Sequence, residues 1–140
     1  MDYRFATVKE NPTGSIVVGF YSYPETIDQG KLAFTQQYEA LSWTFGISYQ
    51  IIKHPEEVFP FGERTVVGIQ EDAEIELQDF IHPEGGTVYI TGNSAYRYPS
   101  KKFKIDKTVR IAVPKIDHPL YGCQATSIVL YNRYMKNANI

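Results

Sequence analysis

Two short apolar runs in the last third of the chain stop abruptly at residues that form turns. The segment "YITGNS" (89–94) passes from apolar residues into Gly92, and "IAVPKIDHPLYG" (111–122) passes from apolar residues into Pro114. Small or conformationally fixed residues leave main-chain N–H and C=O groups free to approach a flat ligand closely. Ligands of open α/β sheets bind beyond the carboxyl ends of the strands. The two turns are therefore candidates for a binding site.

Basic residues are concentrated in the same part of the chain. Residues 1–90 carry five Lys/Arg and fourteen Asp/Glu, whereas residues 91–140 carry nine and two. Only Asp106 offsets the group formed by Arg97, Lys101, Lys102, Lys104, Lys107 and Arg110. Such a group could bind a polyanion, or it could pair with the acidic half of the same or a neighbouring subunit. Counting charges leaves both interpretations open.

Other kinds of site find little support. Cys123 is the single cysteine, which excludes an internal disulfide and a Cys-based zinc site, and three scattered histidines do not form a metal site. The carboxylates of "EDAEIELQD" (71–79) fit the wet face of an amphipathic helix. His82 and His118 each precede a proline and are interpreted as positional residues. We expect no metal.

Length and hydropathy predict one domain over 1–140. A chain of 140 residues with 43% hydrophobic content can bury a substantial core. No apolar run approaches the roughly 20 residues that span a bilayer, and the N-terminus lacks the pattern of a signal peptide. We therefore expect a cytoplasmic protein without a membrane segment.

The predicted elements alternate between strand and helix. Strands are expected at 14–22, 47–53, 63–70, 86–92 and 108–114, and helices at 26–46, 73–81 and 119–137. The continuous apolar runs are typical of parallel strands that are buried on both faces. In the short acidic helix Ile75, Leu77 and Phe80 should point inward. This order predicts an α/β fold with three layers around a mostly parallel sheet.

From about residue 80 onward the chain resembles the SpoU type of SPOUT methyltransferases, the α/β-knot enzymes. In "HPEGGTVYITGNSAYRYP" (82–99) the residues that match the second motif of that family are His82, Pro83, Glu84, Gly92, Asn93 and Pro99. In the third motif the matching residues are Val113, Pro114, Leu120, Ala125 and the run 128–131. The resemblance extends over some 55 residues of the sequence.

The resemblance implies a C-terminal trefoil knot, a homodimer and an S-adenosylmethionine-dependent transfer of methyl groups to ribose 2′-hydroxyls of tRNA or rRNA. The implied cofactor-binding residues are Ile90, Thr91, Gly92, Asn93, Ile111, Val113, Pro114, Leu120 and Gly122. The basic residues Arg97, Lys101, Lys102 and Lys104 are the candidates for contacts with RNA.

The chain departs from the family where the chemistry is carried out. Counting from Gly30 places the family's catalytic arginine at Phe34, and counting back from Gly46 places it at Ala40. The second-motif glutamate is Ser94 here. The candidates for replacement catalytic groups are Lys31, Arg97 and Tyr121.

Two functions follow from these observations. The first is an S-adenosylmethionine-dependent RNA methyltransferase with rebuilt catalytic groups. The second is an inactive dimer of the same fold that binds RNA or a protein. Binding of S-adenosylmethionine would favour the first.

Overall fold

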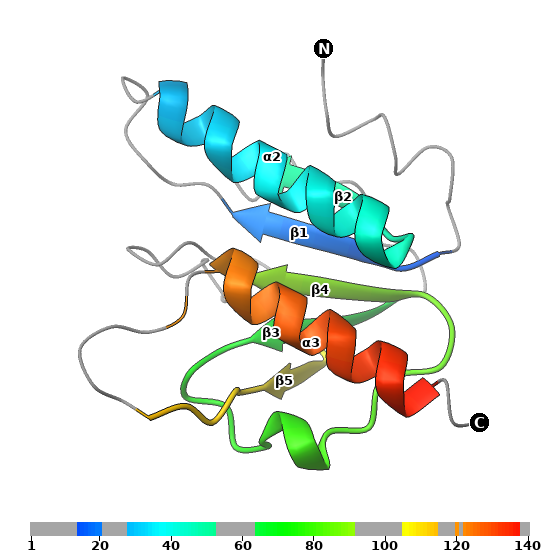
Figure 1. Ribbon diagram of the computed structural model, residues 1–140. Helices are drawn as coiled ribbons and strands as arrows, with labels where there is room; N and C mark the ends of the chain where they lie inside the picture. The colour runs from blue at the N-terminus through cyan, green and yellow to red at the C-terminus, as the bar shows by residue number, and fades with distance from the viewer. Residues whose placement is uncertain are drawn as a thin grey trace.

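The computed structural model describes residues 14–20, 28–52, 64–91, 105–114, 120 and 122–137. Within these ranges the strands and helices follow one another in the order that the sequence predicts (Figure 1). In chain order they are β1 (Ile16–Phe20), α2 (Asp28–Phe45), β2 (Ser48–Ile52), β3 (Thr65–Ile69), the 3₁₀ turn η3 (Leu77–Asp79), β4 (Thr87–Thr91), β5 (Lys107–Val109) and α3 (Gly122–Asn137).

The five strands form one sheet in the order β2-β1-β4-β3-β5, and every pair of neighbours is parallel. Strand β4 lies at the centre, and all five of its residues are buried. Parallel strands in this position are covered on both faces, which is why their sequences are apolar without alternation. The predicted parallel α/β sheet is confirmed.

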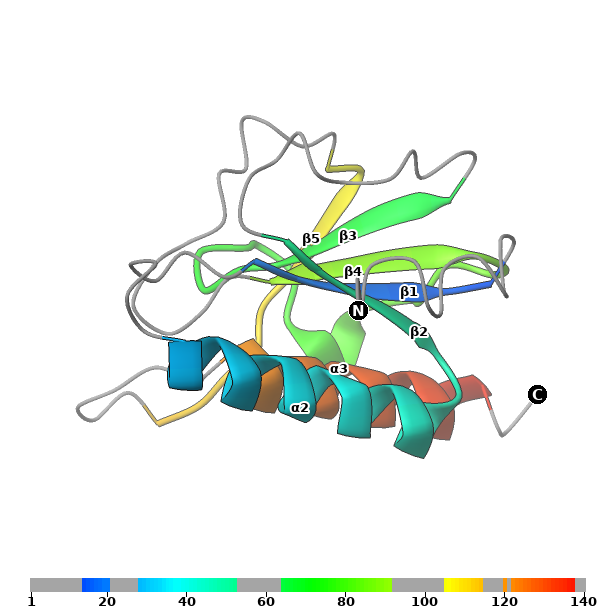
Figure 2. The ribbon, with the colours of Figure 1, turned by 90° about the horizontal axis from the view of Figure 1, so that it is seen from above.

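Helices α2 and α3 lie side by side on one face of the sheet (Figures 1 and 2). Side chains alternate between the two faces of a strand. The row Val17, Tyr49, Val67 and Tyr89 packs in one core cluster with buried side chains of both helices, among them Tyr38, Leu41, Val129 and Leu130. The described part of the chain therefore shows two of the three predicted layers.

Each helix runs back along the sheet against the direction of the strands (Figure 1). Helix α2 ends as predicted at Gly46, which has a φ of 65°. The N–H of Ile47 donates to the carbonyl of Ser42 (3.1 Å), the bond that closes a helix end of this kind. Glycine suits this position because a side chain disfavours positive φ.

Two predicted elements are wrong in part. The acidic helix at 73–81 is reduced to η3, and Ile75 is 47% exposed rather than inward, although Leu77 and Phe80 are buried. The strand expected over 108–114 ends at Val109. Its neighbour β3 ends at Ile69, which is paired with Val109, so the ladder on that side stops there.

The predicted trefoil knot depends on residues outside the described ranges. The connection from β4 to β5 includes residues 92–104, and the connection from β5 to α3 includes residues 115–119. The knot therefore stays a prediction.

Candidate functional site

The strands that lead into the predicted binding turns stop at one end of the sheet. Strands β4 and β5 end there, and both α2 and α3 begin there (Figure 1). The first turn of a helix presents unpaired N–H groups and a partial positive charge. This end of the sheet therefore combines free main-chain groups of strands with those of helices.

Strand β4 contributes Ile90 and Thr91 to this end. Ile90 is fully buried and Thr91 is 6% exposed, so a ligand would meet their main chain rather than their side chains. Thr91 is aligned with Gly19 of β1. Gly92 and Asn93, which follow, lie outside the described residues.

The segment after β5 is more open. Ile111 and Leu120 are partly buried and pack against the core. Val113 is 42% exposed, and Pro114 beside it is also exposed. Gly122 is the buried first residue of α3, and its carbonyl accepts a hydrogen bond from the Thr126 hydroxyl (2.7 Å).

The candidate catalytic residues are placed only in part. Lys31 lies in the first turns of α2, at the same end of the sheet as the predicted cofactor residues. Phe34 and Ala40, the two positions obtained by counting for the family's arginine, also lie on α2. Arg97 and Tyr121 are outside the described ranges, as are the RNA candidates Lys101, Lys102 and Lys104.

Basic residues of the last third that the structure describes mostly contact the protein itself. Arg110 forms an ion pair with Glu76 of the acidic half (2.9 Å). Lys136 donates from Nζ to the carbonyls of Leu77 (3.0 Å), Gln78 (3.1 Å) and Phe80 (2.7 Å). For these two residues internal pairing is the correct interpretation, whereas Lys107 is exposed.

A buried polar network surrounds His82, the first residue of the second motif. Nε2 of His82 lies 2.8 Å from Oδ1 of Asn132. Because an amide oxygen can only accept, Nε2 carries the hydrogen and donates it. Nδ1 then accepts a hydrogen bond from the hydroxyl of Tyr89 (2.9 Å). The ring also makes an edge-on contact with Phe80. Burial lowers the pKa of His82, and the positive charges of Lys136 and Arg133 lower it further, against a hydrogen bond to Asn132 that raises it.

The network fixes the position of the His82 ring, and burial favours its neutral form. Burial raises the pKa of its partner Tyr89 to about 12. Neither group is poised to exchange protons near neutral pH, since each keeps its uncharged form. The positional interpretation of His82 is supported, while His118 lies outside the described residues. The sequence around His82 does not indicate its partner Asn132, which lies 50 residues away along the chain.

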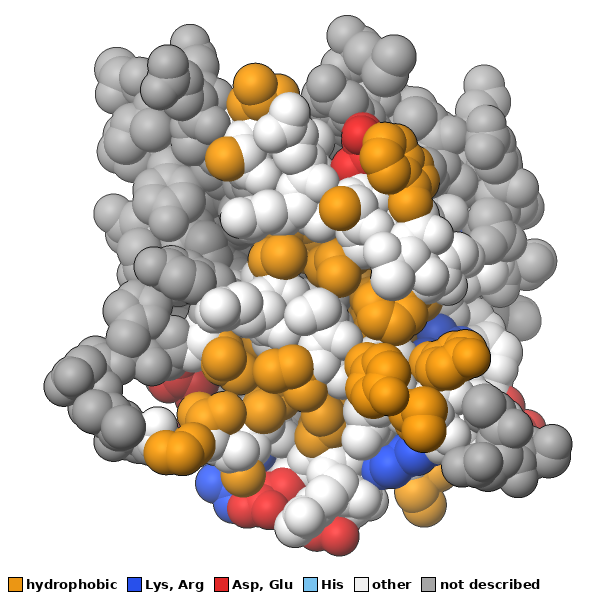
Figure 3. Space-filling model, viewed as in Figure 1, with side chains coloured by type: hydrophobic (Ala, Val, Ile, Leu, Met, Phe, Trp, Pro, Cys, Tyr) orange, Lys and Arg blue, Asp and Glu red, His pale blue; other side chains and the backbone are white. Residues whose placement is uncertain are grey.

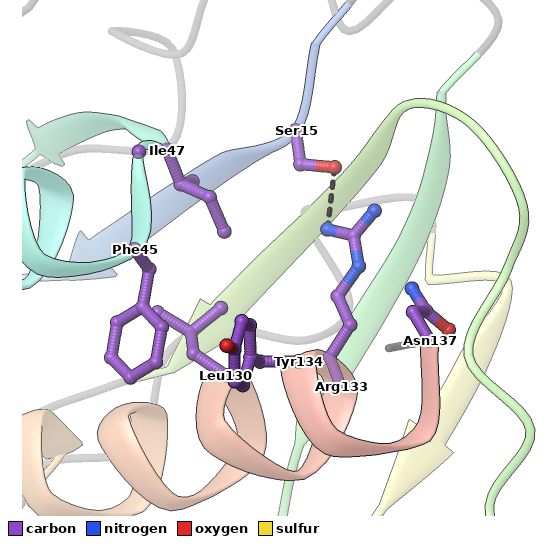
Figure 4. A pocket seen from close by; sticks show the side chains of 8 residues that line it. Ser15, Phe45, Ile47, Leu130, Arg133, Tyr134 and Asn137 are labelled. Atoms are coloured by element: carbon purple, nitrogen blue, oxygen red, sulfur yellow. Dashed lines mark hydrogen bonds between the residues drawn. The ribbon is translucent and has the colours of Figure 1, made fainter. Parts of the chain in front are cut away.

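A hollow of about 460 Å³ lies at the opposite end of the sheet, between the last turns of α2 and α3 (Figure 4). Apolar side chains form much of its wall: Phe45, Ile47, Leu130 and Tyr134. Arg133 points across it and donates from Nη1 to the hydroxyl of Ser15 (2.6 Å). The hollow is thus distant from the carboxyl ends of the strands and is not the predicted cofactor site.

Within the described residues, no helix is long and apolar enough to cross a membrane. No group of three or more His, Cys, Asp or Glu that could hold a metal ion occurs in the same ranges. Cys123 is a free, half-buried thiol, and burial raises its pKa.

Comparison with known proteins finds relatives by structure only. No protein-family model matches the sequence, and no curated protein matches it. The SpoU methyltransferase AviRb from Streptomyces viridochromogenes is similar in structure, with a TM-score of 0.64 and 17% identity over 94% of this chain and 64% of that one. The complex of AviRb with the cofactor AdoMet gives a TM-score of 0.67 at 14% identity, covering 89% of this chain and 57% of that one.

An AdoMet-bound rRNA methyltransferase from Sinorhizobium meliloti gives a TM-score of 0.60 at 13% identity, covering 97% of this chain and 60% of that one. This chain thus spans less than two thirds of the length of AviRb and of the Sinorhizobium enzyme. These likenesses agree with the resemblance seen in the second and third motifs. The described part of the chain therefore has the fold of the SpoU-type methyltransferases of the SPOUT superfamily.

Proposed function

We propose that this chain is an S-adenosylmethionine-dependent RNA methyltransferase of the SpoU type. One observation carries the proposal: the carboxyl ends of β4 and β5 and the first turns of α2 and α3 meet at one end of a SpoU-like sheet. Strand β4, which lies within the second matched motif, ends at this place, and the third motif begins just beyond the end of β5. Similar structures include methyltransferases solved with bound AdoMet.

The residues present fit a cofactor that is held mainly by main-chain groups. After Arg110 the chain is no longer part of a strand, and Val113 is an exposed apolar side chain beside the exposed Pro114. Main-chain groups of 90–93 and 111–114, together with the start of α3 at Gly122, would hold S-adenosylmethionine. The cofactor supplies an electrophilic methyl group on a positively charged sulfur.

The ribose 2′-hydroxyl has to be activated by a side chain of the protein. A 2′-hydroxyl is a poor nucleophile at neutral pH and needs a nearby group that withdraws or accepts its proton. The family's arginine is absent at Phe34 and Ala40, and Lys31 is the basic residue of α2. We assign Lys31 this role, with Arg97 and Tyr121 as the other candidates.

Calorimetry with S-adenosylmethionine and S-adenosylhomocysteine is the first test. Binding of both is expected, and no heat at millimolar ligand would refute the proposal. Transfer of labelled methyl groups to a mixed pool of tRNA and rRNA is the second test. Binding without transfer would favour the inactive binding module instead.

Substitution of Lys31 separates binding from chemistry. The variant Lys31→Met should lose methyl transfer and keep its affinity for S-adenosylhomocysteine, whereas Lys107→Met, at an exposed lysine of β5, should keep both. Full activity of Lys31→Met would mean that the group that activates the ribose comes from another segment.

We also propose that the protein is a homodimer that pairs through α2 and α3. Exposed apolar side chains gather on the face that these helices form (Figure 3). On α2 they are Leu32 (52% exposed) and Trp43 (75%), and on α3 they are Ile128 (38%), Tyr131 (57%), Tyr134 (61%) and Met135 (43%). A standard interface buries about 800 Å² on each partner, and its core is enriched in aromatic residues.

Sedimentation at micromolar concentration tests the dimer. The wild type should sediment as a dimer, and Tyr131→Glu combined with Tyr134→Glu should give a folded monomer. Ile81→Glu, at an 81% exposed position outside both helices, is the matched control and should leave the dimer intact. A wild type that sediments as a monomer would refute this interface.

The basic residues Arg97, Lys101, Lys102 and Lys104 are proposed to contact RNA phosphates. Each lost phosphate contact should reduce the slope of log affinity against log salt by about one. The double variant Lys101→Glu, Lys102→Glu should therefore bind RNA more weakly and with a shallower slope. Unchanged affinity and slope would assign these lysines to internal pairing.

A further inference from the structure

Arg110, the residue that follows β5, forms main-chain hydrogen bonds on the side away from β3. Val109 accepts at its carbonyl from the N–H of Gln70 (3.0 Å), next to the end of β3. On the other side, Arg110 donates its N–H to the carbonyl of Ile75 (2.9 Å) and accepts from the N–H of Leu77 (2.8 Å). The parallel bridge between Glu76 and Arg110 therefore fixes the direction in which residues 111–114 depart from the sheet.

Side chains reinforce this bridge. Nη2 of Arg110 contacts Oε1 of Glu76 at 2.9 Å, and the two side chains are 41% and 29% exposed. The second oxygen of Glu76, Oε2, accepts from the side-chain amide of Gln78 (3.0 Å). Both carboxylate oxygens are thus engaged, which restricts the carboxylate to one orientation.

The same segment is attached to α3. Nζ of Lys136 donates to the carbonyls of Leu77 and Phe80, which lie directly after the bridge. Helix α3 begins at Gly122, at the end of the sheet where residues 111–114 also lie. The connection between β3 and β4 therefore links residue 110, which precedes the segment 111–114, to the last turn of α3, the helix whose first residue is proposed to hold the cofactor.

We infer that Glu76 and Arg110 form a positioning pair that sets the place of residues 111–114 relative to α3 and thereby the affinity for the cofactor. The inference rests on the proposed function and goes beyond it, because neither residue belongs to the matched motifs. Both side chains are partly exposed, so the pair is screened by water and its effect should be moderate. We expect loss of the pair to weaken the binding of S-adenosylhomocysteine by about two- to fivefold.

The test compares Glu76→Gln with Glu74→Gln. Glutamine keeps the size of Glu76 and removes its charge, and Glu74 is an exposed carboxylate on the same connection. Amide hydrogen exchange of the free protein reports on the bridge through the N–H groups of Arg110 and Leu77. Calorimetry with S-adenosylhomocysteine reports on the site.

In Glu76→Gln the two amides should exchange two- to fivefold faster, and S-adenosylhomocysteine should bind two- to fivefold more weakly. The exchange rates of amides in β1 and β4 serve as references and should not change. In Glu74→Gln neither the exchange rates nor the affinity for S-adenosylhomocysteine should change. Arg110→Lys, which keeps the positive charge, should lie closer to the wild type than Arg110→Gln.

The outcomes separate this inference from the proposed function. Unchanged exchange at Arg110 and Leu77 in Glu76→Gln overturns the positioning pair, whether or not the cofactor binds. Faster exchange with unchanged affinity overturns its link to the cofactor. A wild type that does not bind S-adenosylhomocysteine refutes the proposed function and that link together, while the exchange rates still decide whether the pair positions the segment.

Discussion

Protonation of His82 should destabilise the protein in mild acid. The ring is 6% exposed, and hydrogen bonds with Asn132 and Tyr89 fix its position. Burial favours the neutral form of the ring. Lys136 and Arg133 of α3 add positive charge nearby, and the pKa of His82 is lowered from its ordinary value of 6.5. The unfolded chain, where the ring has its ordinary pKa, therefore binds a proton at a pH at which the folded protein does not.

The sign and the size follow from this difference. Above pH 6.5 both states carry a neutral ring, and His82 adds no pH dependence. As the pH falls from about 6.5 towards the lowered pKa, the free energy of unfolding decreases by up to about 1.4 kcal/mol per pH unit. Below the lowered pKa both states are protonated and this loss stops growing.

Urea denaturation between pH 8 and pH 5 measures the effect. In His82→Gln a neutral amide can still donate to Asn132 and accept from Tyr89, so the loss in this window should largely disappear. His54→Gln and His118→Gln are matched controls that should keep it. If the wild type and His82→Gln lose stability in parallel between pH 7 and pH 5, the reasoning is refuted.

Three further substitutions, one of them with a control, test the contacts of helices α2 and α3. Leu130→Ala should cost about 2–5 kcal/mol of unfolding free energy because the side chain is 1% exposed, whereas Ile81→Ala, at 81% exposure and outside the proposed dimer face, should cost under about 1 kcal/mol; urea denaturation compares them. Lys136→Met should cost about 1–3 kcal/mol, since it leaves three backbone carbonyls without their charged donor, and faster exchange of the Phe80 amide should accompany it. Gly46→Ala should lower the free energy of unfolding by the cost of positive φ alone, about 1 kcal/mol, because apart from Gly46 and its chain neighbours no atom lies within 4 Å of the added Cβ; urea denaturation measures it, and a loss above about 3 kcal/mol would contradict this.

The sequence predicts the strands well because their burial is uniform. The runs 16–18 and 88–90 are apolar without alternation, which follows from burial on both faces of a parallel sheet. The end of α2 is predicted by Gly46, where the backbone needs a positive φ. In these places a local pattern and the tertiary structure favour the same conformation.

The predicted helix at 73–81 and the predicted length of β5 are wrong because hydrogen bonds between distant segments determine the structure there. Leu77 and Phe80 have the i, i+3 spacing of a helix, yet the backbone at Glu76 forms a bridge with Arg110, and only one 3₁₀ turn follows it. The length of β5 depends on where β3 ends, and β3 lies some 40 residues earlier in the chain. No local pattern contains this information.

The polar network around His82 is hidden from the sequence for the same reason. Its partners are 7 and 50 residues away, and the bond from Arg133 to Ser15 spans 118 residues. The one local signal is Tyr89, since a tyrosine in a fully buried strand requires a partner for its hydroxyl. That signal predicts a partner and does not identify it.

The two ends of the sheet place different demands on the sequence. At the end with the hollow, the contact between Arg133 and Ser15 joins α3 to the start of β1 through side chains, so substitutions there act on stability. At the carboxyl end the proposed cofactor contacts are main-chain groups, which tolerate changes of side chain as long as the backbone keeps its course. The proposed cofactor contacts therefore do not depend on an arginine at position 34 or 40. Because Glu76 and Arg110 set that course, cofactor affinity should respond more to this pair than to substitution of the exposed Val113.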